Sequence, residues 1–424
     1  MDTRRLEEVI SDQKQEIAKL MQKKFVERKE ESLVDLNSNL AQVVIGVRRS
    51  GKSILCRNVL KKSGVHFAYV NFDDERLYSL RGDDLNDVLQ ILYKVYGEFE
   101  YLFIDEIQNI SEWFLFVNRL LRNGMHILIT GSNAKLLSGE LATHLSGRHT
   151  QIELYPFSFS EYCDFFDVDR TSVATKETAF RRAAFDDYIK NGGFPEFIAN
   201  PQNQTYINTL VKNILETDIK NRYKVRYTAV LTNLAQHIMN IAPSSINYTE
   251  LQNLFSLKSV HTAENYAAFY KNAYIFVGLQ KYSSKSKFRV TNEKFYCIDV
   301  ALMNRRENAF AGENLGWRLE TLVYIELLRR YRPQMKDIYY YVDRSGEVDF
   351  VVCDQNRVEA LYQVSFDISS GKTKKRELNA LINGATKLNC KNLYLITDHE
   401  RCFVNEKGYD IKICPAYDWM CGID

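Results

Sequence analysis

Residues 42–155 alternate short apolar runs with longer segments of helical periodicity. The apolar runs are VVIGV, VHFAYVNF, YLFIDE, HILITG and HTQIELY. Unbroken apolar runs of this length are typical of strands buried on both faces of a parallel sheet, and the intervening segments are long enough for crossover helices. The pattern predicts an α/β domain over residues 38–155, built on a parallel sheet.

The first 37 residues carry apolar side chains at roughly helical spacing between many charged residues. These apolar positions are Leu6, Val9, Ile10, Ile17, Leu20, Met21 and Phe25. Their spacing predicts an amphipathic helix within residues 1–37 that lies against the following domain. A solvated helical arm is the alternative that the pattern leaves open.

The rest of the chain divides into three further segments. Residues 156–227 have helical periodicity, interrupted at NGGFPEF. Residues 228–303 predict three helices and then two strands, a winged-helix pattern, and Thr249 or Ser245 is expected to cap a helix near APSSINYTE. Residues 304–424 open with the helical stretch NLGWRLETLVYIELLRRY and continue with strands around IYYYVD, EVDFVVC, ALYQVSF and NLYLITD.

The composition indicates the cellular compartment of the protein but does not indicate its binding partner. The 424 residues are 45% hydrophobic and 26% charged, and the net charge of +2 neither requires nor excludes nucleic acid. The eight cysteines form no C-x-x-C pair and the seven histidines have no metal-ligand spacing, so a reducing compartment fits better than a secreted setting. No apolar run reaches the ~20 residues of a membrane span, and MDTRRLEEVI lacks the apolar core of a signal peptide. We expect a cytoplasmic protein without a membrane partner.

The segment GVRRSGKS fits the phosphate-binding pattern G-x-x-x-x-G-K-[ST]. In such a loop backbone N–H groups surround the β-phosphate, Lys52 contacts the β- and γ-phosphates, and the Ser53 hydroxyl binds Mg²⁺. A chance glycine turn is the alternative, but an apolar strand precedes the loop and a helical stretch follows it. The nucleotide-binding residues predicted here are Gly46, Arg48, Arg49, Ser50, Gly51, Lys52, Ser53 and Ile54.

The apolar strand YLFIDEIQ ends in two acids. Asp105 is placed to hold the water shell of Mg²⁺, and Glu106 is placed to activate a water molecule for attack on the γ-phosphate. One acid would suit binding alone, whereas two suit hydrolysis. A pair of solvent-facing acids at a strand end is the alternative reading.

Two further segments carry candidate residues. The strand ILITGSN ends in Thr130, Ser132 and Asn133, which either contact the γ-phosphate and the attacking water or cap the next helix. Arg148, in HLSGRHT, is either an arginine finger, acting on its own nucleotide or on that of a neighbouring subunit, or an ordinary surface arginine. An oligomer is therefore among the expected assemblies.

Taken together, GVRRSGKS, YLFIDEIQ, ITGSN, LSGRHTQIELYPFSFSEY and NGGFPEF closely resemble the archaeal-type P-loop ATPases of the AAA+ and STAND assemblage. These are commonly joined to a C-terminal domain of unknown function. The resemblance implies ATP rather than GTP, a helical lid over residues 156–227 and a prokaryotic origin. It also implies that Gly193 and Pro195, in the lid element GG-x-P, lie near the nucleotide base.

The end of the chain resembles the restriction-endonuclease-like, PD-(D/E)xK fold. An active member uses acids from a helix and a first strand, plus a Glu-x-Lys pair on the second strand, to bind Mg²⁺ and activate water. Glu320, Glu347 and Asp349 supply acids, but Gln363 and Ser365 stand where the Glu and Lys belong. We expect a catalytically degenerate domain, with an ATP-regulated nuclease as the weaker alternative.

Two basic and aromatic stretches are candidates for phosphate contacts. One is KNRYKVRY at residues 220–227, and the other contains Lys281, Tyr282, Lys285, Lys287, Phe288 and Arg289. DNA binding and a solvated or protein-binding face both remain open. The sequence therefore predicts an ATP- and Mg²⁺-dependent ATPase that moves or gates its attached modules, on DNA or with a protein partner.

Overall fold

The computed structural model describes residues 2–132, 145, 147–203, 205–283, 293–304 and 314–423. The chain forms two compact units, Met1–Leu154 with Asn272–Tyr274, and Tyr155–Lys271 with Ile275–Asp424. Each unit is described by itself. Asn133, Lys285, Lys287, Phe288 and Arg289 lie outside the described residues.

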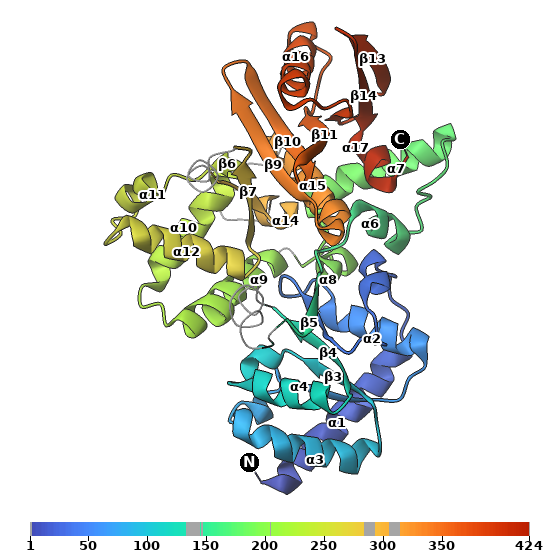
Figure 1. The fold of residues 1–424 in the computed structure, drawn as a ribbon, viewed down its shortest axis with the longest axis vertical. Coiled ribbons are helices and arrows are strands. Elements are labelled where there is room, and N and C mark those ends of the chain that lie inside the picture. The colour runs from blue at the N-terminus through green and yellow to red at the C-terminus, as the bar shows by residue number, and fades with distance from the viewer. Residues whose placement is uncertain are drawn as a thin grey trace. The chain divides into compact units, whose positions relative to one another are not determined.

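The first unit contains the parallel sheet that the sequence predicts (Figure 1). Five strands lie in the order β2-β3-β4-β1-β5, so the first strand along the chain sits between β4 and β5. The strands are β1 (Ala41–Ile45), β2 (Phe67–Asn71), β3 (Tyr101–Asp105), β4 (His126–Gly131) and β5 (His149–Glu153). The helices that pack on them are α1 (Thr3–Met21), α2 (Lys52–Ser63), α3 (Leu85–Tyr96) and α4 (Trp113–Arg122). Short 3₁₀ turns lie at Lys29–Leu33, Glu75–Leu77, Gly82–Asp84 and Ile107–Asn109.

Helix α1 lies against the sheet, which confirms the predicted amphipathic helix and excludes the solvated arm. Its apolar side buries Leu6, Val9, Ile10 and Ile17 against the region of α3 and β2. Gln13 adds a polar contact, since its side chain exchanges hydrogen bonds of 3.0 and 2.9 Å with the backbone of Asn71. This amide pairs backbone groups at the edge strand β2, which would otherwise lack partners on that side.

The second unit begins with helices. They are α6 (Phe159–Phe165), α7 (Thr175–Asn191), α8 (Pro195–Ala199), α9 (Tyr206–Asn213), the π-helical segment Ile214–Asn221, α10 (Thr228–Ile241), α11 (Tyr248–Leu254) and α12 (Val260–Asn272). The predicted break at NGGFPEF falls between α7 and α8. The expected cap was wrong, because Asn247 rather than Thr249 or Ser245 caps α11 and accepts the N–H groups of Thr249 and Glu250.

A nine-stranded mixed sheet forms the rest of the second unit, in the order β13-β14-β12-β11-β10-β9-β7-β8-β6. The strands are β6 (Ser244–Ser245), β7 (Phe276–Lys281), β8 (Lys294–Cys297), β9 (Asp337–Asp343), β10 (Gly346–Asp354), β11 (Arg357–Val364), β12 (Leu393–Thr397), β13 (Cys402–Glu406) and β14 (Tyr409–Pro415). The remaining helices are α14 (Val300–Asn304), α15 (Leu315–Tyr331), the 3₁₀ turn Arg332–Gln334, α16 (Gly371–Leu388) and α17 (Ala416–Cys421).

The β7–β8 hairpin belongs to the same sheet as the C-terminal strands. Strand β7 pairs in parallel with β9, and Gln280 lies opposite Tyr339. Sheet hydrogen bonding therefore continues across residue 304, the boundary that the sequence suggested between two domains. In this unit the hairpin is a structural extension of the C-terminal sheet, as Figure 1 shows.

The two glycines of NGGFPEF are required by close packing within the second unit. A Cβ at Gly193 would lie 2.2 Å from the carbonyl oxygen of Phe157, and a Cβ at Gly192 would lie 1.8 Å from Asp299 Oδ1. The Asp299 carboxylate accepts the backbone N–H groups of Gly193 and Ala301, each at 2.8 Å. The glycines thus have a packing reason that needs no nucleotide.

We expect Gly193→Ala to lower the thermal unfolding temperature by about 5 °C or more, because a backbone carbonyl cannot move away from the new methyl group. Gly371→Ala is the matched control, since a Cβ at Gly371 would meet nothing within 4 Å. Equal unfolding temperatures for the two variants, measured by calorimetry, would contradict this packing argument.

The buried Asp299 carboxyl should make the free energy of unfolding depend on pH. Burial raises its pKa to about 6, so the folded state binds this proton more tightly than the unfolded chain does. The stabilisation is therefore complete below the ordinary aspartate pKa of ~3.9 and is lost as the pH rises through the folded value. Compared with Asp299→Asn, the wild type should gain on the order of 2 kcal/mol of unfolding free energy between pH 7.5 and pH 4.5. Urea unfolding at both pH values tests this, and a pH-independent difference would contradict it.

Candidate functional site

The loop between β1 and α2 has backbone geometry that only glycine tolerates at its first position. Gly46 has φ +151°, and a Cβ there would lie 2.0 Å from the carbonyl oxygen of Leu154. Gly51 has φ +99° and precedes the first residue of α2. The loop therefore curls tightly over the helix N-terminus, where unpaired backbone N–H groups attract an anion.

Lys52 is folded back over this loop. Its side chain is only 4% exposed, and Nζ donates hydrogen bonds to the carbonyl oxygens of Gly46 (3.2 Å) and Val47 (3.1 Å). The same ammonium lies 4.0 Å from Glu106 Oε1. A buried ammonium in contact with neutral carbonyls and one half-buried carboxylate is well placed to exchange these partners for phosphate oxygens.

Asp105 joins the ends of three elements at the carboxyl edge of the sheet. Its Oδ1 accepts the Ser53 hydroxyl from α2 at 2.9 Å and also the Thr130 hydroxyl from β4. Burial, and then the charge of neighbouring Glu106, raise the pKa of Asp105 to about 6, and the two hydroxyl hydrogen bonds oppose that rise. Tyr69 on β2 donates a longer hydrogen bond of 3.4 Å to Oδ2.

These side chains fit a magnesium ion. Ser53 and Asp105 present adjacent oxygen donors, and Mg²⁺ in nucleotide sites takes one or two protein oxygens with the remainder from phosphates and water. Over the described residues, no three His, Cys, Asp or Glu side chains cluster so as to hold a metal by themselves. The loop also buries the Ser50 hydroxyl, for which the described residues provide no hydrogen-bond partner.

Glu106 is held in a strained backbone conformation next to this pair. Its φ of +52° is in the left-handed region, and its N–H donates to Thr130 Oγ1 at 3.0 Å. The Gln108 amide donates to the Glu106 carboxylate and also to Ser132 Oγ at 3.3 Å. The structure thus brings Thr130 and Ser132 together with both acids. Gln108 was missed by the sequence analysis, although it stands only two residues beyond Glu106.

Arg28 was also missed, and no motif in the sequence marks it. It is 5% exposed and lies in the segment after α1, where its Nη1 donates 3.0 Å to the carbonyl oxygen of Ser50. The segment is held on α2 in part by Phe25, whose ring lies 4.8 Å from the Arg57 guanidinium. Arg28, which is outside the phosphate-binding motif, therefore stabilises the phosphate loop through the backbone of Ser50.

The other predicted residues have different surroundings. Arg48 forms a 3.6 Å ion pair with Asp73, Arg49 is exposed at the loop surface, and Ile54 is half-buried in the first turn of α2. Arg148 is exposed and precedes β5 at the amino edge of the sheet, so about 15 Å of strand separates it from the phosphate loop of its own chain. Action on a neighbouring copy remains a prediction. Gly193 and Pro195 belong to the second unit, and their proximity to a nucleotide base also stays a prediction.

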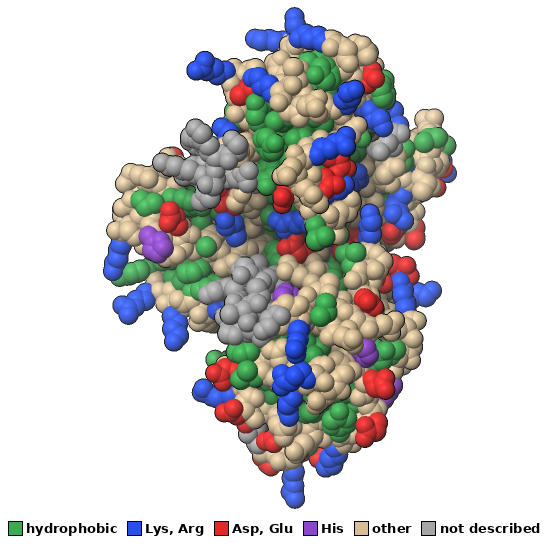
Figure 2. Space-filling model, viewed as in Figure 1, with side chains coloured by type: hydrophobic (Ala, Val, Ile, Leu, Met, Phe, Trp, Pro, Cys, Tyr) green, Lys and Arg blue, Asp and Glu red, His purple; other side chains and the backbone are tan. Residues whose placement is uncertain are grey.

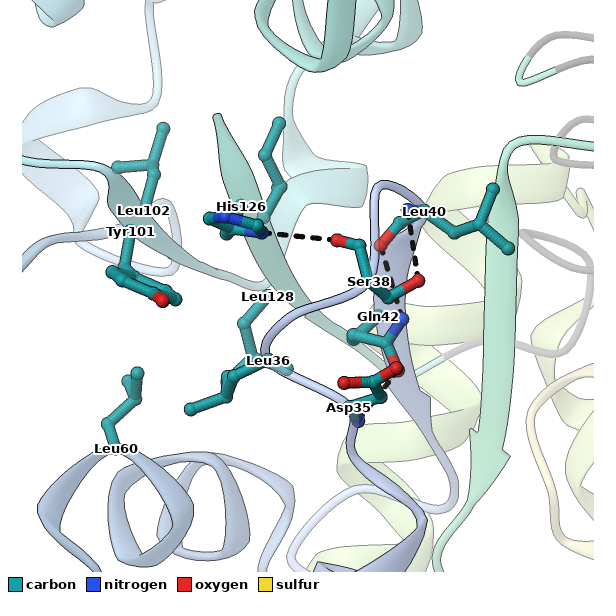
Figure 3. Close-up of a pocket in the computed structure, with 11 residues that line it drawn as sticks. Asp35, Leu36, Ser38, Leu40, Gln42, Leu60, Tyr101, Leu102, His126 and Leu128 are labelled. Atoms are coloured by element: carbon teal, nitrogen blue, oxygen red, sulfur yellow. Dashed lines mark hydrogen bonds between the residues drawn. The ribbon is translucent and has the colours of Figure 1, made fainter. Parts of the chain in front are cut away.

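A pocket in the first unit lies away from these residues. Figure 3 shows it at the amino-terminal ends of β3 and β4, where Tyr101 and His126 begin their strands. Most of its lining is aliphatic, and the His126 ring contacts the carbonyl oxygen of Ser38 at 3.2 Å. The phosphate loop lies at the opposite, carboxyl edge of the same sheet. This pocket is therefore not the candidate nucleotide site.

The second unit contains the acids that the nuclease resemblance singled out. Glu320 on α15 accepts the Tyr296 hydroxyl at 2.6 Å, and Asp349 on β10 accepts the backbone N–H of Val364 at 2.8 Å. Burial, and then the charge of Glu320, raise the pKa of Asp349 well above its usual range. Lys294 on β8, which no motif suggested, reaches Glu320 and Glu347.

Gln363 and Ser365, which replace the Glu and Lys of the nuclease pattern, hydrogen bond to other groups. Gln363 on β11 donates to Glu377 at 2.9 Å, and its carbonyl oxygen faces the Asp349 N–H at 3.4 Å. Ser365 donates to the carbonyl oxygen of Asp367 at 3.2 Å. The structure thus gathers the acids in one region and adds a lysine from an unexpected strand.

The sheet order, the glycine loop and the two acids at the carboxyl end of β3 define a P-loop ATPase domain of the AAA class. Residues 38–163 match the AAA domain model, and residues 182–312 and 315–417 match two domains of unknown function (DUF8612 and DUF4143). Uncharacterized protein MJ1544 of Methanocaldococcus jannaschii is 33% identical over 429 residues, covering 97% of this chain and 94% of that protein. The chain belongs to this family, as the motif resemblance predicted: archaeal-type AAA ATPases with a C-terminal domain of unknown function.

Two further similarities were found. An uncharacterized protein of Haemophilus influenzae is 32% identical over 410 residues, covering 91% of this chain and 95% of that protein. The solved Walker-type ATPase paby2304 of Pyrococcus abyssi is similar with a TM-score of 0.42 and 15% identity, covering 66% of this chain and 95% of that one. Across the described ranges, no helix is both long and apolar enough to cross a membrane.

We expect Arg28→Ala to weaken the binding of a fluorescent ATP analogue roughly tenfold, because the charged hydrogen bond to the Ser50 carbonyl is lost next to the anion site. Lys29→Ala changes the neighbouring exposed cation and should bind as the wild type does. Unchanged affinity in Arg28→Ala, measured by fluorescence titration with folding verified by circular dichroism, would show that the loop holds its shape without Arg28.

Proposed function

We propose that this protein hydrolyses ATP with Mg²⁺ and uses the cycle to change the conformation of its attached modules. The proposal depends on one observation above all: Ser53, Asp105, Thr130 and Glu106 form a connected hydrogen-bonded set beside the buried Lys52. A site that only bound phosphate would need the loop and the lysine. The second acid, held in a left-handed backbone conformation, adds a candidate base.

Each residue has a distinct role in this proposal. The loop N–H groups and Lys52 bind the β- and γ-phosphates, and Ser53 and Asp105 hold Mg²⁺, which neutralises phosphate charge when it is bound. Glu106 accepts a proton from the water molecule that attacks the γ-phosphate, and Gln108 holds that carboxylate in place. Thr130 hydrogen bonds to Asp105 and to the Glu106 backbone, so it links the metal ligand to the base.

DNA is the partner that the surface charges favour. In the stretch 220–227, Lys224 and Arg226 are exposed and Lys220 is half-buried, and Lys258, two residues before α12, is also exposed. Figure 2 shows Lys and Arg side chains projecting from the part of the molecule that α10–α12 form. Exposed cations of this kind contact phosphates without reading sequence. A nucleotide-gated switch with a protein partner is the second candidate, with slow turnover and no response to DNA.

The test is ATP hydrolysis by the full chain, with and without duplex or single-stranded DNA. We expect Glu106→Gln to lower kcat about 100-fold or more while ATP still binds, because the loss of a general base affects the chemical step. Lys52→Ala should lose ATP binding itself. Glu112→Gln and Lys61→Ala are the matched controls, because both positions are exposed and lie outside the site.

The outcomes separate the candidates. DNA stimulation that disappears in Lys52→Ala and Glu106→Gln would support a DNA-linked ATPase. Slow hydrolysis that DNA does not change would favour the switch. Hydrolysis that survives in Lys52→Ala, at the wild-type rate, would rule out the proposed site.

A further inference from the structure

A buried lysine lies among the acids of the second unit. Lys294 is the first residue of β8, is 9% exposed, and its ammonium forms a hydrogen bond with Glu347 Oε1. Glu320 Oε1 lies 3.9 Å from the same nitrogen, and the Tyr340 ring centroid lies 5.0 Å from it. The cluster therefore joins three elements, β8, α15 and β10, around one positive charge.

The nuclease resemblance implies Mg²⁺ at these acids, and the side chains do not fit that ion. In the described part of the chain, no three acidic, histidine or cysteine side chains are arranged to hold a metal. Gln363, on the strand that should supply a carboxylate, directs its amide to Glu377, and Asp349 Oδ2 is occupied by the Val364 N–H. The Lys294 ammonium already lies against Glu347 and close to Glu320.

The origin of the lysine matters for its role. In an active site of this fold the lysine would stand at Ser365, immediately after β11, beside the metal ligands. Here the cation comes instead from β8, four strands away from β11 in the order β11-β10-β9-β7-β8. Lys294 reaches Glu320 and Glu347 from the β7–β8 hairpin, and its ion pairs tie that hairpin to α15 and β10.

We propose that the Lys294 ammonium is the resident cation of this carboxylate cluster, in place of a divalent metal, and that it fastens the β7–β8 hairpin to the C-terminal sheet. Without this charge the carboxylates of Glu320 and Glu347, which both lie beside Lys294 Nζ, would repel each other, so the cluster needs one cation. Lys294 supplies this positive charge at all times, because it is part of the chain. The cluster then stabilises the structure and is not a nuclease site. This proposal does not depend on whether the first unit hydrolyses ATP.

The proposal predicts a latent metal site. Removing the ammonium in Lys294→Ala leaves Glu320, Glu347 and Asp349 with space and excess negative charge, which suits a divalent cation with oxygen ligands. We expect Lys294→Ala to unfold about 6 °C or more below the wild type, and millimolar Mn²⁺ to recover a measurable part of that loss. The parent chain of the experiment, which retains Lys294, should show no Mn²⁺-dependent shift.

The experiment uses nucleotide-free full chain with Ser53→Ala in every sample, so that the phosphate loop contributes no metal binding. Thermal unfolding is followed at increasing Mn²⁺, and bound Mn²⁺ is counted by electron paramagnetic resonance. Lys271→Ala is the matched control, because Lys271 forms a 2.7 Å pair with a single carboxylate, Glu293, and its loss should not be repaired by Mn²⁺. Adding Asp349→Asn to Lys294→Ala should reduce the recovery.

Two results would overturn the proposal. One is stoichiometric Mn²⁺ binding by the chain that retains Lys294, lost in Asp349→Asn, which would make the cluster a metal site as it stands. This arm needs no lysine variant and holds even if Lys294→Ala fails to fold. The other is a folded Lys294→Gln chain, included as the milder change, that is as stable as its parent with and without Mn²⁺. Such a chain would show that the charge is dispensable.

Discussion

The Asp105 carboxylate is the group on which the first unit's chemistry depends. It accepts hydroxyl hydrogen bonds from Ser53 on α2 and Thr130 on β4, and it ends β3. Three elements that are far apart in sequence thus meet at one buried acid. If this acid moved, the serine of the phosphate loop and the threonine that positions Glu106 would both lose their partner.

Burying that acid costs free energy, and the cost explains its surroundings. Burial and the charge of Glu106 raise the pKa of Asp105 to about 6, and two hydroxyl groups and Lys52 act in the opposite direction. A divalent cation would compensate the same charge more strongly. The surroundings of Asp105 therefore suit a divalent cation with oxygen ligands.

The second unit solves a similar electrostatic problem in a different way. Its clustered acids Glu320, Glu347 and Asp349 are accompanied by a lysine of the same chain, and the burial of Lys294, which lowers its pKa, is outweighed by their negative charges, which raise its pKa and keep it an ammonium. Because the cation is covalently part of the chain, it also joins strands. Two kinds of contact therefore hold the second unit together: the hydrogen bonds of the continuous sheet from β13 to β6, and the ion pairs of Lys294.

Local pattern was enough to predict the strands, the phosphate loop, the paired acids and the amphipathic helix α1. Apolar runs and glycine positions are set by neighbours within a few residues, so they can be read along the chain. Arg28 at the Ser50 carbonyl and Lys294 among the acids depend on contacts between segments far apart in sequence. So does the packing of Gly193 against Phe157 and Asp299. Only the tertiary structure decides such contacts, because the free energy that selects them is gained when distant elements pack together.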